Sequence, residues 1–351
     1  MKRVRIGMKR LRKVACTLAV FVLAVAVLAG CTTGGSTGGG AAKPPAGGEQ
    51  PKPAPEAGKK KLSMATGGVT GTYYPIGAAI AKVISTKVPG LEVTAEATGA
   101  SVANLKMMRS GDVDLILSAS NTAFGAFKGE KPFDDGAVKN MRAIMALYPE
   151  VFQFVTRKDS GIKSIADLKG KKIVVGAPGS GTERTAQMIL AAYGLSYNDI
   201  KPEFLSFGEG ITAMKDKLAD VVVIGAGIPT SAVVDASSSL PINLIELDQA
   251  KLADLFKKEV YLTGVTIPAG TYKGIDRDVF SAASPALLLV RENMDEETVY
   301  RITKAIFENI QAIAEAHVQG KTITLENAVK GVSIEFHPGA RKYLQEKGVL
   351  K

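Results

Sequence analysis

The feature of this sequence that most constrains its fold is an alternation of short strand-like stretches with longer helix-like ones. Leu62 to Thr66 and Leu91 to Ala97 are typical of strands, and a helix is expected between them from about Tyr73. The apolar side chains of that helix recur at helical spacing on one face: Ile76, Ile80, Val83 and Ile84. A helix from Ser101 and a strand at Val113 to Leu117 repeat the pattern. The alternation predicts βαβ units, in which helices flank a parallel sheet.

A second set of such units follows Arg157. Strands are expected at Ile173 to Gly176 and at Val221 to Ile224, with a helix through Met188 to Ala192 between them. Further on, Val299 to Ala316 is predicted as one helix, because its apolar residues recur at three- and four-residue intervals and form a face for core packing.

Two lobes are expected, because the 290 residues from Leu62 to Lys351 exceed what one hydrophobic core usually serves. We predict that residues 62–150 and 281–351 form lobe 1 and that residues 151–280 form lobe 2. Two apolar stretches lie where the chain would have to change sheets, and we interpret them as strands that cross between the lobes: Val151 to Thr156 and Pro285 to Val290.

The start of the chain has the features of an export signal. Met1 to Lys13 carries seven positive charges and no acid, and Val14 to Gly30 is an almost unbroken apolar run. The run ends in Leu28-Ala29-Gly30-Cys31, which resembles the lipobox of bacterial lipoproteins. We therefore predict a lipoprotein signal peptide at residues 1–30 and lipid attachment at Cys31. The alternative is an uncleaved anchor helix, and in both cases the rest of the chain lies outside the cytoplasm, held at a bacterial membrane.

Charge and cysteine content exclude several functions. The net charge of +10 comes mostly from the signal segment, and its removal leaves +3, so no nucleic-acid partner is expected. Cys16 lies in the signal and Cys31 is the predicted lipid site, so the remaining domain has no thiol for a disulfide or a thiolate metal site. Residues 31–61 are rich in Gly and Pro, which predicts a flexible tether.

Catalytic and metal-binding motifs are scarce. The only histidines, His317 and His337, have no second His or Cys at ligand spacing, so no metal site and no cofactor are expected. Ser180 lies in Gly179-Ser180-Gly181, one residue short of the Gly-x-Ser-x-Gly nucleophile elbow. The same turn lacks the lysine of a phosphate-binding loop. A surface enzyme that uses Ser180 as a nucleophile remains an alternative.

Three turns of small residues lead directly into predicted helices. They are Gly67-Gly68-Val69-Thr70-Gly71-Thr72, Thr98-Gly99-Ala100-Ser101 and Gly179-Ser180-Gly181-Thr182. Helix N-termini present unpaired amides and a partial positive charge, and glycine lets a ligand approach them closely. Since open α/β sheets bind ligands at the ends of their strands, we predict that the three turns hold an anion. The alternative is that Thr72, Ser101 and Thr182 only cap their helices.

Several longer stretches carry a resemblance to a known family. They are Ala65-Thr66-Gly67-Gly68, Gly71-Thr72-Tyr73-Tyr74-Pro75-Ile76-Gly77, Thr98-Gly99-Ala100-Ser101-Val102-Ala103-Asn104-Leu105, Ser110-Gly111-Asp112 with Asp114, Leu147-Tyr148-Pro149-Glu150, Asp167-Leu168-Lys169-Gly170-Lys171, Gly179-Ser180-Gly181-Thr182-Glu183, Gly227-x-Pro229-Thr230, and His337-Pro338-Gly339-Ala340 with Tyr343. Over essentially all of residues 61–351 the chain resembles the TRAP-associated extracytoplasmic immunogenic (TAXI) receptors, the substrate-binding subunits of one class of TRAP transporters.

This resemblance implies an α/β, two-lobe type II periplasmic-binding-protein fold with hinge-crossing strands. It also implies a receptor without enzyme activity that captures a small carboxylate, glutamate-like or a dicarboxylate, by lobe closure and delivers it to an integral membrane TRAP permease. We expect a monomer. The ligand-binding residues that follow from the matching positions are Thr70, Gly71, Thr72, Tyr74, Ser101, Asn104, Ser180, Gly181, Thr182, Pro229 and Thr230.

One stretch departs from the family. Where the family usually has a Gln-Asn or Gln-Ser pair before a helix with aromatic residues, this chain has residues 118–124, Ser-Ala-Ser-Asn-Thr-Ala-Phe. Ser120 and Asn121 stay candidates for ligand contact, but the identity of the ligand is not transferred. Glu150 has two open roles, contact with a ligand ammonium group or a solvated position beside the hinge.

Two further alternatives remain at this level. The same type of receptor could feed an ATP-driven importer, or the chain could be a surface adhesin or sensor without a transport role.

Overall fold

The computed structural model of the chain describes residues 58–351. The predicted signal peptide at residues 1–30, the predicted lipid attachment at Cys31 and most of the predicted tether at residues 31–61 lie outside the described residues. Among residues 58–351, no helix combines the length and the apolar character that a membrane crossing requires.

Lobe 1 is built on three parallel strands that the alternating sequence pattern predicted. β1 (Lys60–Ala65) lies between β2 (Leu91–Glu96) and β3 (Leu115–Ala119). The crossovers are α1 (Tyr73–Lys87) and α2 (Ser101–Ser110), which pack on opposite faces of the sheet. Both predicted helix starts, at the first residue of α1 and of α2, are therefore confirmed.

Lobe 2 repeats this arrangement. β5 (Lys172–Val174) lies between β6 (Lys201–Glu203) and β7 (Val221–Ala226), again with all three strands parallel. α4 (Gly181–Ala192) connects β5 to β6, and α5 (Phe207–Lys215) connects β6 to β7. The two strands and the helix predicted in this part of the sequence are confirmed, with boundaries shifted by a few residues.

Other elements were not predicted from the sequence pattern. In lobe 1 they are α3 (Ser120–Lys128) and α10 (Pro338–Glu346), and in lobe 2 they are α6 (Ser231–Ser239), β8 (Ile242–Ile245), α7 (Gln249–Lys258) and β9 (Thr263–Ile267). Short 3-10 helices lie at Lys158–Ser160, Ile165–Leu168, Val318–Thr322 and Asn327–Val329.

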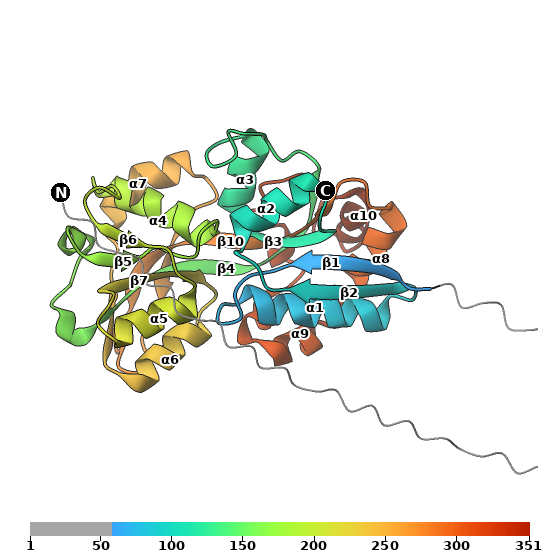
Figure 1. Cartoon of the computed structure of the whole chain (residues 1–351). Coiled ribbons are helices and arrows are strands. Elements are labelled where there is room, and N and C mark those ends of the chain that lie inside the picture. Colours follow the sequence, from blue (N-terminus) through green and yellow to red (C-terminus); the bar gives the residue numbers. More distant parts are fainter. Residues whose placement is uncertain (1–57) are drawn as a thin grey trace, which may run out of the picture. The chain divides into compact units, whose positions relative to one another are not determined.

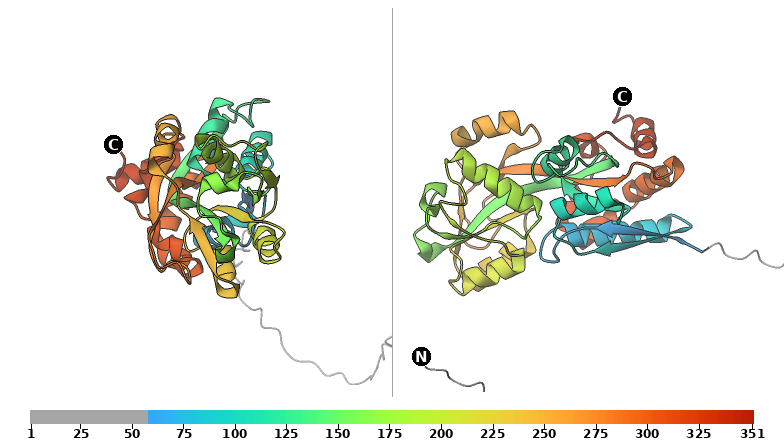
Figure 2. Two further views of the ribbon diagram at one scale, coloured as in Figure 1. Left: turned by 90° about the vertical axis from the view of Figure 1, so that its left-hand side faces the viewer. Right: turned by 45° about the horizontal axis from the view of Figure 1, so that its top comes forward.

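Two long strands connect the lobes. β4 (Met141–Arg157) and β10 (Val279–Arg291) are antiparallel to each other, and β10 pairs with β3 in lobe 1 and with β9 in lobe 2, while β4 pairs with β7 and β8 in lobe 2. The sheet runs in the order β2-β1-β3-β10-β4-β7-β5-β6, with β8 and β9 off this path. Figures 1 and 2 show the two strands running from one lobe into the other. The crossing strands predicted from the sequence are parts of β4 and β10, whereas the predicted lobe boundaries stay a prediction.

Two prolines face each other where the crossing strands pass between the lobes. Pro149 of β4 pairs with Pro285 of β10, and the register of the ladder shifts between Pro285 and Leu287. Proline has no backbone N–H, so neither residue can donate a ladder hydrogen bond. At this pair the connection between the lobes therefore lacks two of the backbone donors that other residues of a ladder supply.

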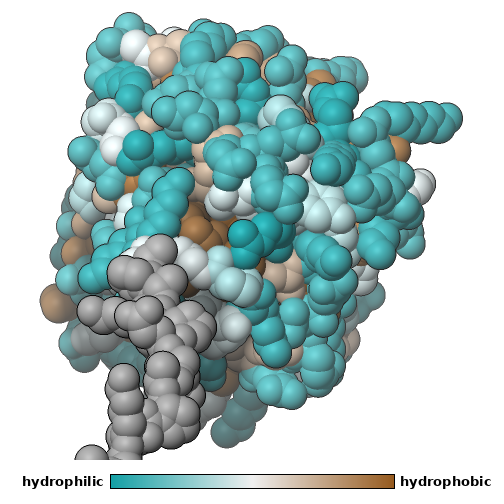
Figure 3. All heavy atoms as spheres, turned by 90° about the vertical axis from the view of Figure 1, so that its right-hand side faces the viewer, coloured by the Kyte–Doolittle hydropathy of each residue, from teal (hydrophilic) through white to brown (hydrophobic). Residues whose placement is uncertain are grey.

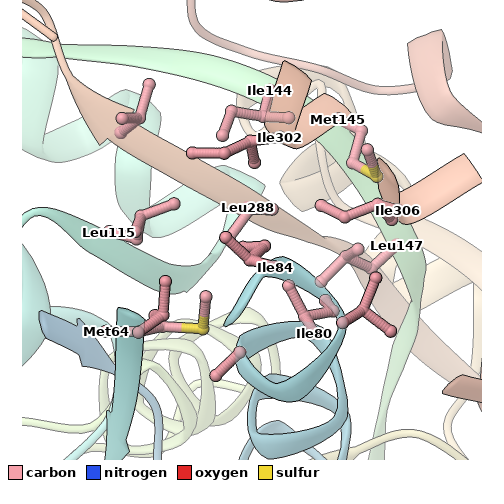
Figure 4. Packing of buried hydrophobic residues seen from close by; sticks show 14 of the residues in the cluster. Met64, Ile80, Ile84, Leu115, Ile144, Met145, Leu147, Leu288, Ile302 and Ile306 are labelled. Carbon is pink, nitrogen blue, oxygen red and sulfur yellow. The ribbon is translucent and has the colours of Figure 1, made fainter. Parts of the chain in front are cut away.

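Each lobe has its own hydrophobic cores. On one face of the lobe 1 sheet, Ile80 and Ile84 of α1 and two isoleucines of the C-terminal region, Ile302 and Ile306, surround Leu288 (Figure 4). The other face buries side chains of α2 and α3, and lobe 2 has a cluster on each face of its own sheet. Burial stabilises each such side chain by about 1.5–3 kcal/mol. The separate cores favour two rigid bodies joined by the strands between them.

The prediction of a single helix from Val299 to Ala316 is wrong. The structure has two helices there, α8 (Glu296–Glu308) and α9 (Ile310–Ala316), separated by Asn309. The side-chain amide of Asn309 donates to the carbonyl oxygen of Ala305 over 2.8 Å, and its backbone leaves the helical region, at φ −128° and ψ 29°. Local side-chain bonding of this kind competes with the helical ladder, which the apolar periodicity alone does not reveal.

The surface of lobe 1 on the side away from lobe 2 is mainly hydrophilic, with apolar atoms in small separate areas (Figure 3). Large apolar side chains that are exposed among the described residues are few and come from different elements: Val69, Phe204, Leu218, Val234, Val260 and Val318. Isolated exposed residues of this kind are ordinary on a monomer.

Candidate functional site

A cavity of about 70 Å³ lies between the lobes, where the strand ends of lobe 1 face those of lobe 2. Its walls come from the turns before α1, α2, α4 and α5, from the end of β7 and from the middle of β4. The lining residues are Gly67, Gly68, Thr70, Gly71, Thr72, Tyr73, Thr98, Gly99, Ala100, Ser101, Tyr148, Glu150, Ala177, Ser180, Gly181, Thr182, Ser206, Phe207, Gly225 and Ala226. A cavity of this volume has room for several water molecules, and so for a small solute.

The three predicted glycine-rich turns meet at this cavity. Eight of the residues predicted to bind a ligand line it: Thr70, Gly71, Thr72, Ser101, Glu150, Ser180, Gly181 and Thr182. A fourth helix start, that of α5, joins them through Ser206 and Phe207, which the sequence reasoning missed. A signal for it exists, because Ser206 and Glu209 form a capping box, the Ser-x-x-Glu pattern that marks a helix start.

The helix starts of lobe 1 are not capped by their own side chains. The N-cap residues of α1 and α2 are Thr72 and Ala100, and neither provides a side-chain cap bond. At α4, in contrast, the Ser180 hydroxyl accepts from the amide of Glu183 over 3.0 Å. A capping role thus explains the small polar residues of the turn before α4, but it does not explain those of the two turns of lobe 1. The first amides of α1 and α2 have no partner within their helices and carry partial positive charge toward the cavity.

Asn104 is a predicted binding residue that does not line the cavity. Its side-chain amide donates to the carbonyl oxygens of Thr66 and Leu117 over 2.6 and 2.8 Å, and its oxygen accepts from the Thr98 hydroxyl over 2.6 Å. Asn104 therefore ties the ends of β1 and β3 to the turn before α2.

Ser120 and Asn121 also lie outside the cavity walls. The Ser120 hydroxyl donates to the carbonyl oxygen of Gly331 over 2.6 Å. The Asn121 amide group donates to the Thr185 hydroxyl over 3.1 Å, which joins α3 of lobe 1 to α4 of lobe 2. Asn121 is a contact between the lobes in this structure.

Thr230 belongs to a buried polar network in lobe 2 and does not line the cavity. Its hydroxyl donates to the carbonyl oxygen of Gly227 over 2.7 Å and accepts from the side-chain amide of Gln153 over 3.0 Å. The Tyr272 hydroxyl accepts from the amide of Thr230 over 3.0 Å and donates to Gln153. The network fixes the turn after β7. The other two predicted residues that do not line the cavity, Tyr74 and Pro229, are half-buried and exposed respectively.

In the part of the chain that the structure describes, Glu150 is the one acidic side chain in the cavity wall, and it is 6% exposed. No Lys, Arg or His lines the cavity, and among the described residues Glu150 has no salt bridge. Burial raises the pKa of Glu150 to about 8, an effect that hydrogen bonding with the Tyr73 hydroxyl opposes. Of the two roles left open for Glu150, the solvated position does not agree with the structure, because the carboxyl group is buried beside the cavity, and contact with a ligand stays a prediction.

Two tyrosines accompany Glu150. The Tyr73 hydroxyl lies 3.3 Å from the Ser101 hydroxyl. Burial raises the pKa of Tyr73 well above its usual value, and the charge of Glu150 is the second largest cause. Tyr148 is 3% exposed, and its hydroxyl has no hydrogen-bond partner in the described part of the chain. Strand alternation places Tyr148 and Glu150 on the same face of β4, which is the signal that could have added Tyr148 to the predicted site. A buried hydroxyl without a partner marks a place where a ligand or water can bind.

The lobes contact each other directly around the cavity. The Thr72 hydroxyl donates to the carbonyl oxygen of Gly227 over 3.4 Å, and the amide of Ala232 donates to the carbonyl oxygen of Thr70 over 3.3 Å. A Cβ atom at Gly181 would lie only 2.7 Å from the Ser101 hydroxyl oxygen of the other lobe. The structure therefore represents a closed arrangement, in which glycine allows the two helix starts to approach.

Arg184 of α4 makes a further contact between the lobes. Its guanidinium is 6% exposed and lies 3.4 Å from the Glu130 carboxylate and 3.4 Å from the carbonyl oxygen of Lys131, both in lobe 1. Phe124 of lobe 1 and Tyr261 of lobe 2 also pack edge to face, with ring centroids 5.0 Å apart. These residues form a second region of contact outside the cavity.

The histidines have structural roles. A ring nitrogen of His317 accepts from the amide of Gln319, and His337 caps α10 through the amide of Gly339. Among residues 58–351, no group of three or more His, Cys, Asp or Glu side chains is arranged to hold a metal ion.

Comparison with known proteins gives one family match and several structural relatives. The model of the NMT1-like family matches residues 64–348. A protein from Bordetella bronchiseptica RB50 is 22% identical with a TM-score of 0.50, covering 82% of this chain and 82% of its own. PhnD1 from Prochlorococcus marinus, solved with methylphosphonate, is 12% identical with a TM-score of 0.50. The match covers 75% of this chain and 90% of PhnD1. The substrate binding protein of an amino acid ABC transporter is 13% identical with a TM-score of 0.45. The match covers 75% of this chain and 98% of that protein. The predicted two-lobe type II periplasmic-binding-protein fold is confirmed.

Proposed function

The chain belongs to the NMT1-like family, and on that premise we propose that it is an extracytoplasmic solute-binding protein of a membrane transporter. The observation that carries the proposal is the cavity between two closed lobes, into which helix starts from both lobes open. Two of those starts lack a side-chain cap, and a buried tyrosine hydroxyl has no partner there. These groups are suited to hold a small carboxylate by hydrogen bonds.

Binding is proposed to act through lobe closure. A solute held by the turns before α1 and α2 attracts the turn before α4, and the closed form is what a permease recognises. Charged hydrogen bonds contribute about 1.5–3 kcal/mol each, so four to six of them are enough for micromolar affinity before the ordering cost is subtracted. The protein acts as a receptor and not as an enzyme.

Two classes of transporter are candidates for the partner. The matching glycine-rich stretches support a TRAP permease of the TAXI type. The second candidate is an ATP-driven importer, and one of the structural relatives is the substrate binding protein of an amino acid ABC transporter. That likeness itself bears on the fold alone. Uptake that stops when the ion gradient collapses supports the first class, and uptake that stops only when ATP is depleted supports the second.

The anchor is proposed at Cys31, with the folded part held at a bacterial membrane by the tether. Metabolic labelling with a fatty-acid analogue tests it, because Cys31→Ser must abolish the label.

The binding function is tested with a panel of amino acids and dicarboxylates in thermal denaturation. A ligand at 100 times its Kd stabilises the folded state by about 2.7 kcal/mol. Ala177→Leu places a larger side chain at the cavity wall and is expected to remove the stabilisation, whereas Ala191→Leu, on the exposed side of α4, is the matched control. A ligand that stabilises both variants equally would place binding elsewhere.

A further inference from the structure

A second cavity, named here the hinge cavity, lies where the crossing strands pass between the lobes. It has a volume of about 370 Å³, and its lining includes the facing prolines, Pro149 of β4 and Pro285 of β10. Residues 146–148 of β4 and 283–284 of β10 continue the lining along the two strands. Small-molecule sites usually have volumes of about 300–1,000 Å³, so the hinge cavity has room for a larger ligand than the cavity between the lobes.

The walls of the hinge cavity come from both lobes. Thr263, at the start of β9, belongs to lobe 2, whereas Thr322, Asn327 and Lys330 belong to the C-terminal segment that packs on the core of lobe 1. The Thr322 hydroxyl donates to the carbonyl oxygen of Leu147 over 3.2 Å, which ties this segment to β4. A rotation of the lobes about the proline pair changes the distance between the two walls. The hinge cavity therefore has its present form only in the closed arrangement.

Tyr148 is shared by the two cavities. It lines the hinge cavity and also the cavity between the lobes. Its ring lies close to lobe 2, because a Cβ atom at Gly227 would be 3.2 Å from the Cδ2 atom of Tyr148. A ligand in the hinge cavity thus contacts a residue that forms part of the wall of the other cavity.

The lining of the hinge cavity is mostly apolar. Alanine, leucine and proline side chains of the crossing strands contribute to it, together with Tyr148. Two of its polar side chains have partners within the fold, since the Asn327 amide group donates to the carbonyl oxygen of Thr322 over 3.0 Å and the Ser284 hydroxyl oxygen accepts from the amide of Asn121 over 3.2 Å. A ligand therefore gains more from burial of apolar surface than from hydrogen bonds to these groups.

One charged side chain borders the hinge cavity. Among the described residues of the lining, Lys330 is the only one that carries a charge. Its ammonium group donates to Glu326 and to the side-chain oxygen of Asn327, but the Lys330 side chain is 59% exposed and the pair with Glu326 is weak for that reason. An ammonium group has three donors, so it can bind a ligand anion as well.

We propose that the hinge cavity is a second ligand site, which binds a small apolar monoanion with its apolar part against Pro149 and Pro285 and its anionic group at Lys330. The ligand fits the closed arrangement and raises the population of that arrangement. The site itself is independent of the solute held between the lobes, whereas its effect on closure rests on the proposed function.

The probe is octanoate, and octanamide is the uncharged compound of the same length. Calorimetric titration gives their dissociation constants for wild type and variants. Thr263→Phe fills the hinge cavity from an exposed position of β9, and Thr266→Phe, also exposed on β9 but not in the lining, is the matched control. Ala177→Leu narrows the cavity between the lobes and shows whether octanoate binds there instead.

Octanoate is expected to bind wild type at one site and to bind Thr263→Phe about tenfold or more weakly, because the added ring occupies the site. Thr266→Phe and Ala177→Leu should bind it as wild type does. Lys330→Gln should weaken octanoate about threefold and octanamide not at all, whereas Lys321→Gln, exposed and outside the lining, changes neither. Since the Lys330 side chain is exposed, this pair of variants keeps the test valid where Thr263→Phe does not fold.

The effect on closure is measured by amide exchange at two contacts between the lobes. The amide of Ala103 donates to the carbonyl oxygen of Gly179, and the amide of Ala232 donates to that of Thr70. Octanoate at about ten times its Kd is expected to slow the exchange of both amides about tenfold, because only the closed arrangement binds it. In Thr263→Phe the same concentration should leave both rates unchanged.

The inference is overturned if octanoate does not bind wild type saturably, if Ala177→Leu abolishes binding and Thr263→Phe does not, or if Lys330→Gln and Lys321→Gln bind octanoate alike. Unchanged amide exchange with octanoate bound overturns the effect on closure. In each case the proposed function stands, because the panel of amino acids and dicarboxylates tests the cavity between the lobes. If octanoate binds as expected and that panel yields no ligand, the proposed function falls and the hinge site remains.

Discussion

The amide of Ala103 in lobe 1 donates to the carbonyl oxygen of Gly179 in lobe 2 over 3.0 Å. Ala103 lies in the first turn of α2, and Gly179 lies in the turn before α4, so two of the helix starts that border the cavity contact each other. A helix cannot satisfy its own first amides, and here the opposite lobe satisfies one of them. Separation of the lobes returns both groups to water, and the walls of the cavity separate with them.

Gly181→Ala is expected to favour the open arrangement. Its Cβ would lie 2.7 Å from the Ser101 hydroxyl oxygen and 3.2 Å from that of Thr122, both in the other lobe. The backbone of Gly181 lies in α4, which accepts alanine, so the free energy of unfolding should change by no more than about 0.5 kcal/mol. Small-angle X-ray scattering should show a larger radius of gyration, and solute affinity should fall by roughly tenfold or more because the competent state is less populated. An unchanged radius would contradict this prediction.

Arg184→Gln is expected to loosen the contact between α3 and α4. The variant loses the charged contact with Glu130 and the bond to the carbonyl oxygen of Lys131. Hydrogen bonds to charged groups contribute about 1.5–3 kcal/mol, so amide exchange of α3 should accelerate. Arg277→Gln is the control, because the half-exposed pair of Arg277 with Glu246 contributes about 1 kcal/mol at most. Equal rates of amide exchange of α3 in the two variants would exclude a role of Arg184 in holding the lobes closed.

The stability of the empty protein should depend on the protonation of Glu150. Below its usual pKa of 4.5 the group is protonated in the folded and unfolded states alike. Between pH 4.5 and the raised pKa of about 8, only the unfolded state loses the proton, so folding stability falls as pH rises. The decrease is at most about 1.4 kcal/mol per pH unit from this group. Urea denaturation at pH 5, 6, 7 and 8 should therefore show that wild type loses stability relative to Glu150→Gln as the pH rises. If the free energies of unfolding of the two proteins change in parallel with pH, the raised pKa of Glu150 is refuted.

Tyr272→Phe should destabilise lobe 2. The change leaves the amide of Thr230 and the side-chain oxygen of Gln153 without their hydroxyl partner in a buried network. A buried polar group left unpaired costs about 1–3 kcal/mol. Tyr300→Phe is the matched control, since the Tyr300 hydroxyl bonds to the exposed Glu346 and should change stability by less than about 0.5 kcal/mol. Thermal denaturation of both variants gives the comparison.

Much of the fold could be predicted from the sequence, because local patterns report local structure. Apolar spacing gave the helix from Tyr73, and the small residues before Ser101 and Gly181 marked two further helix starts. The break at Asn309 was missed, since it depends on one side chain bonding back to Ala305. Apolar periodicity continues through such a break and cannot reveal it.

The candidate site was predictable only in part, because several polar residues near the turns have partners in the fold itself. Asn104 bonds to the ends of two strands, and Thr230 bonds to Gln153 and Tyr272. These partners are distant in sequence, so a motif alone cannot separate a structural amide or hydroxyl from one that faces a cavity. Tyr148 is the converse case, since it lines the cavity without any glycine-rich turn of its own.

The facing pair of Pro149 and Pro285 bears on how the two lobes can move relative to each other. Elsewhere in a ladder, a twist between neighbouring strands stretches amide-to-carbonyl bonds, but at this pair neither residue has an amide hydrogen to lose. Torsion concentrated there leaves the remaining rungs intact, so the strands behave as a soft torsional joint between two stiff bodies. Such a joint suits the proposed lobe closure, because each lobe can move without a change in its own core.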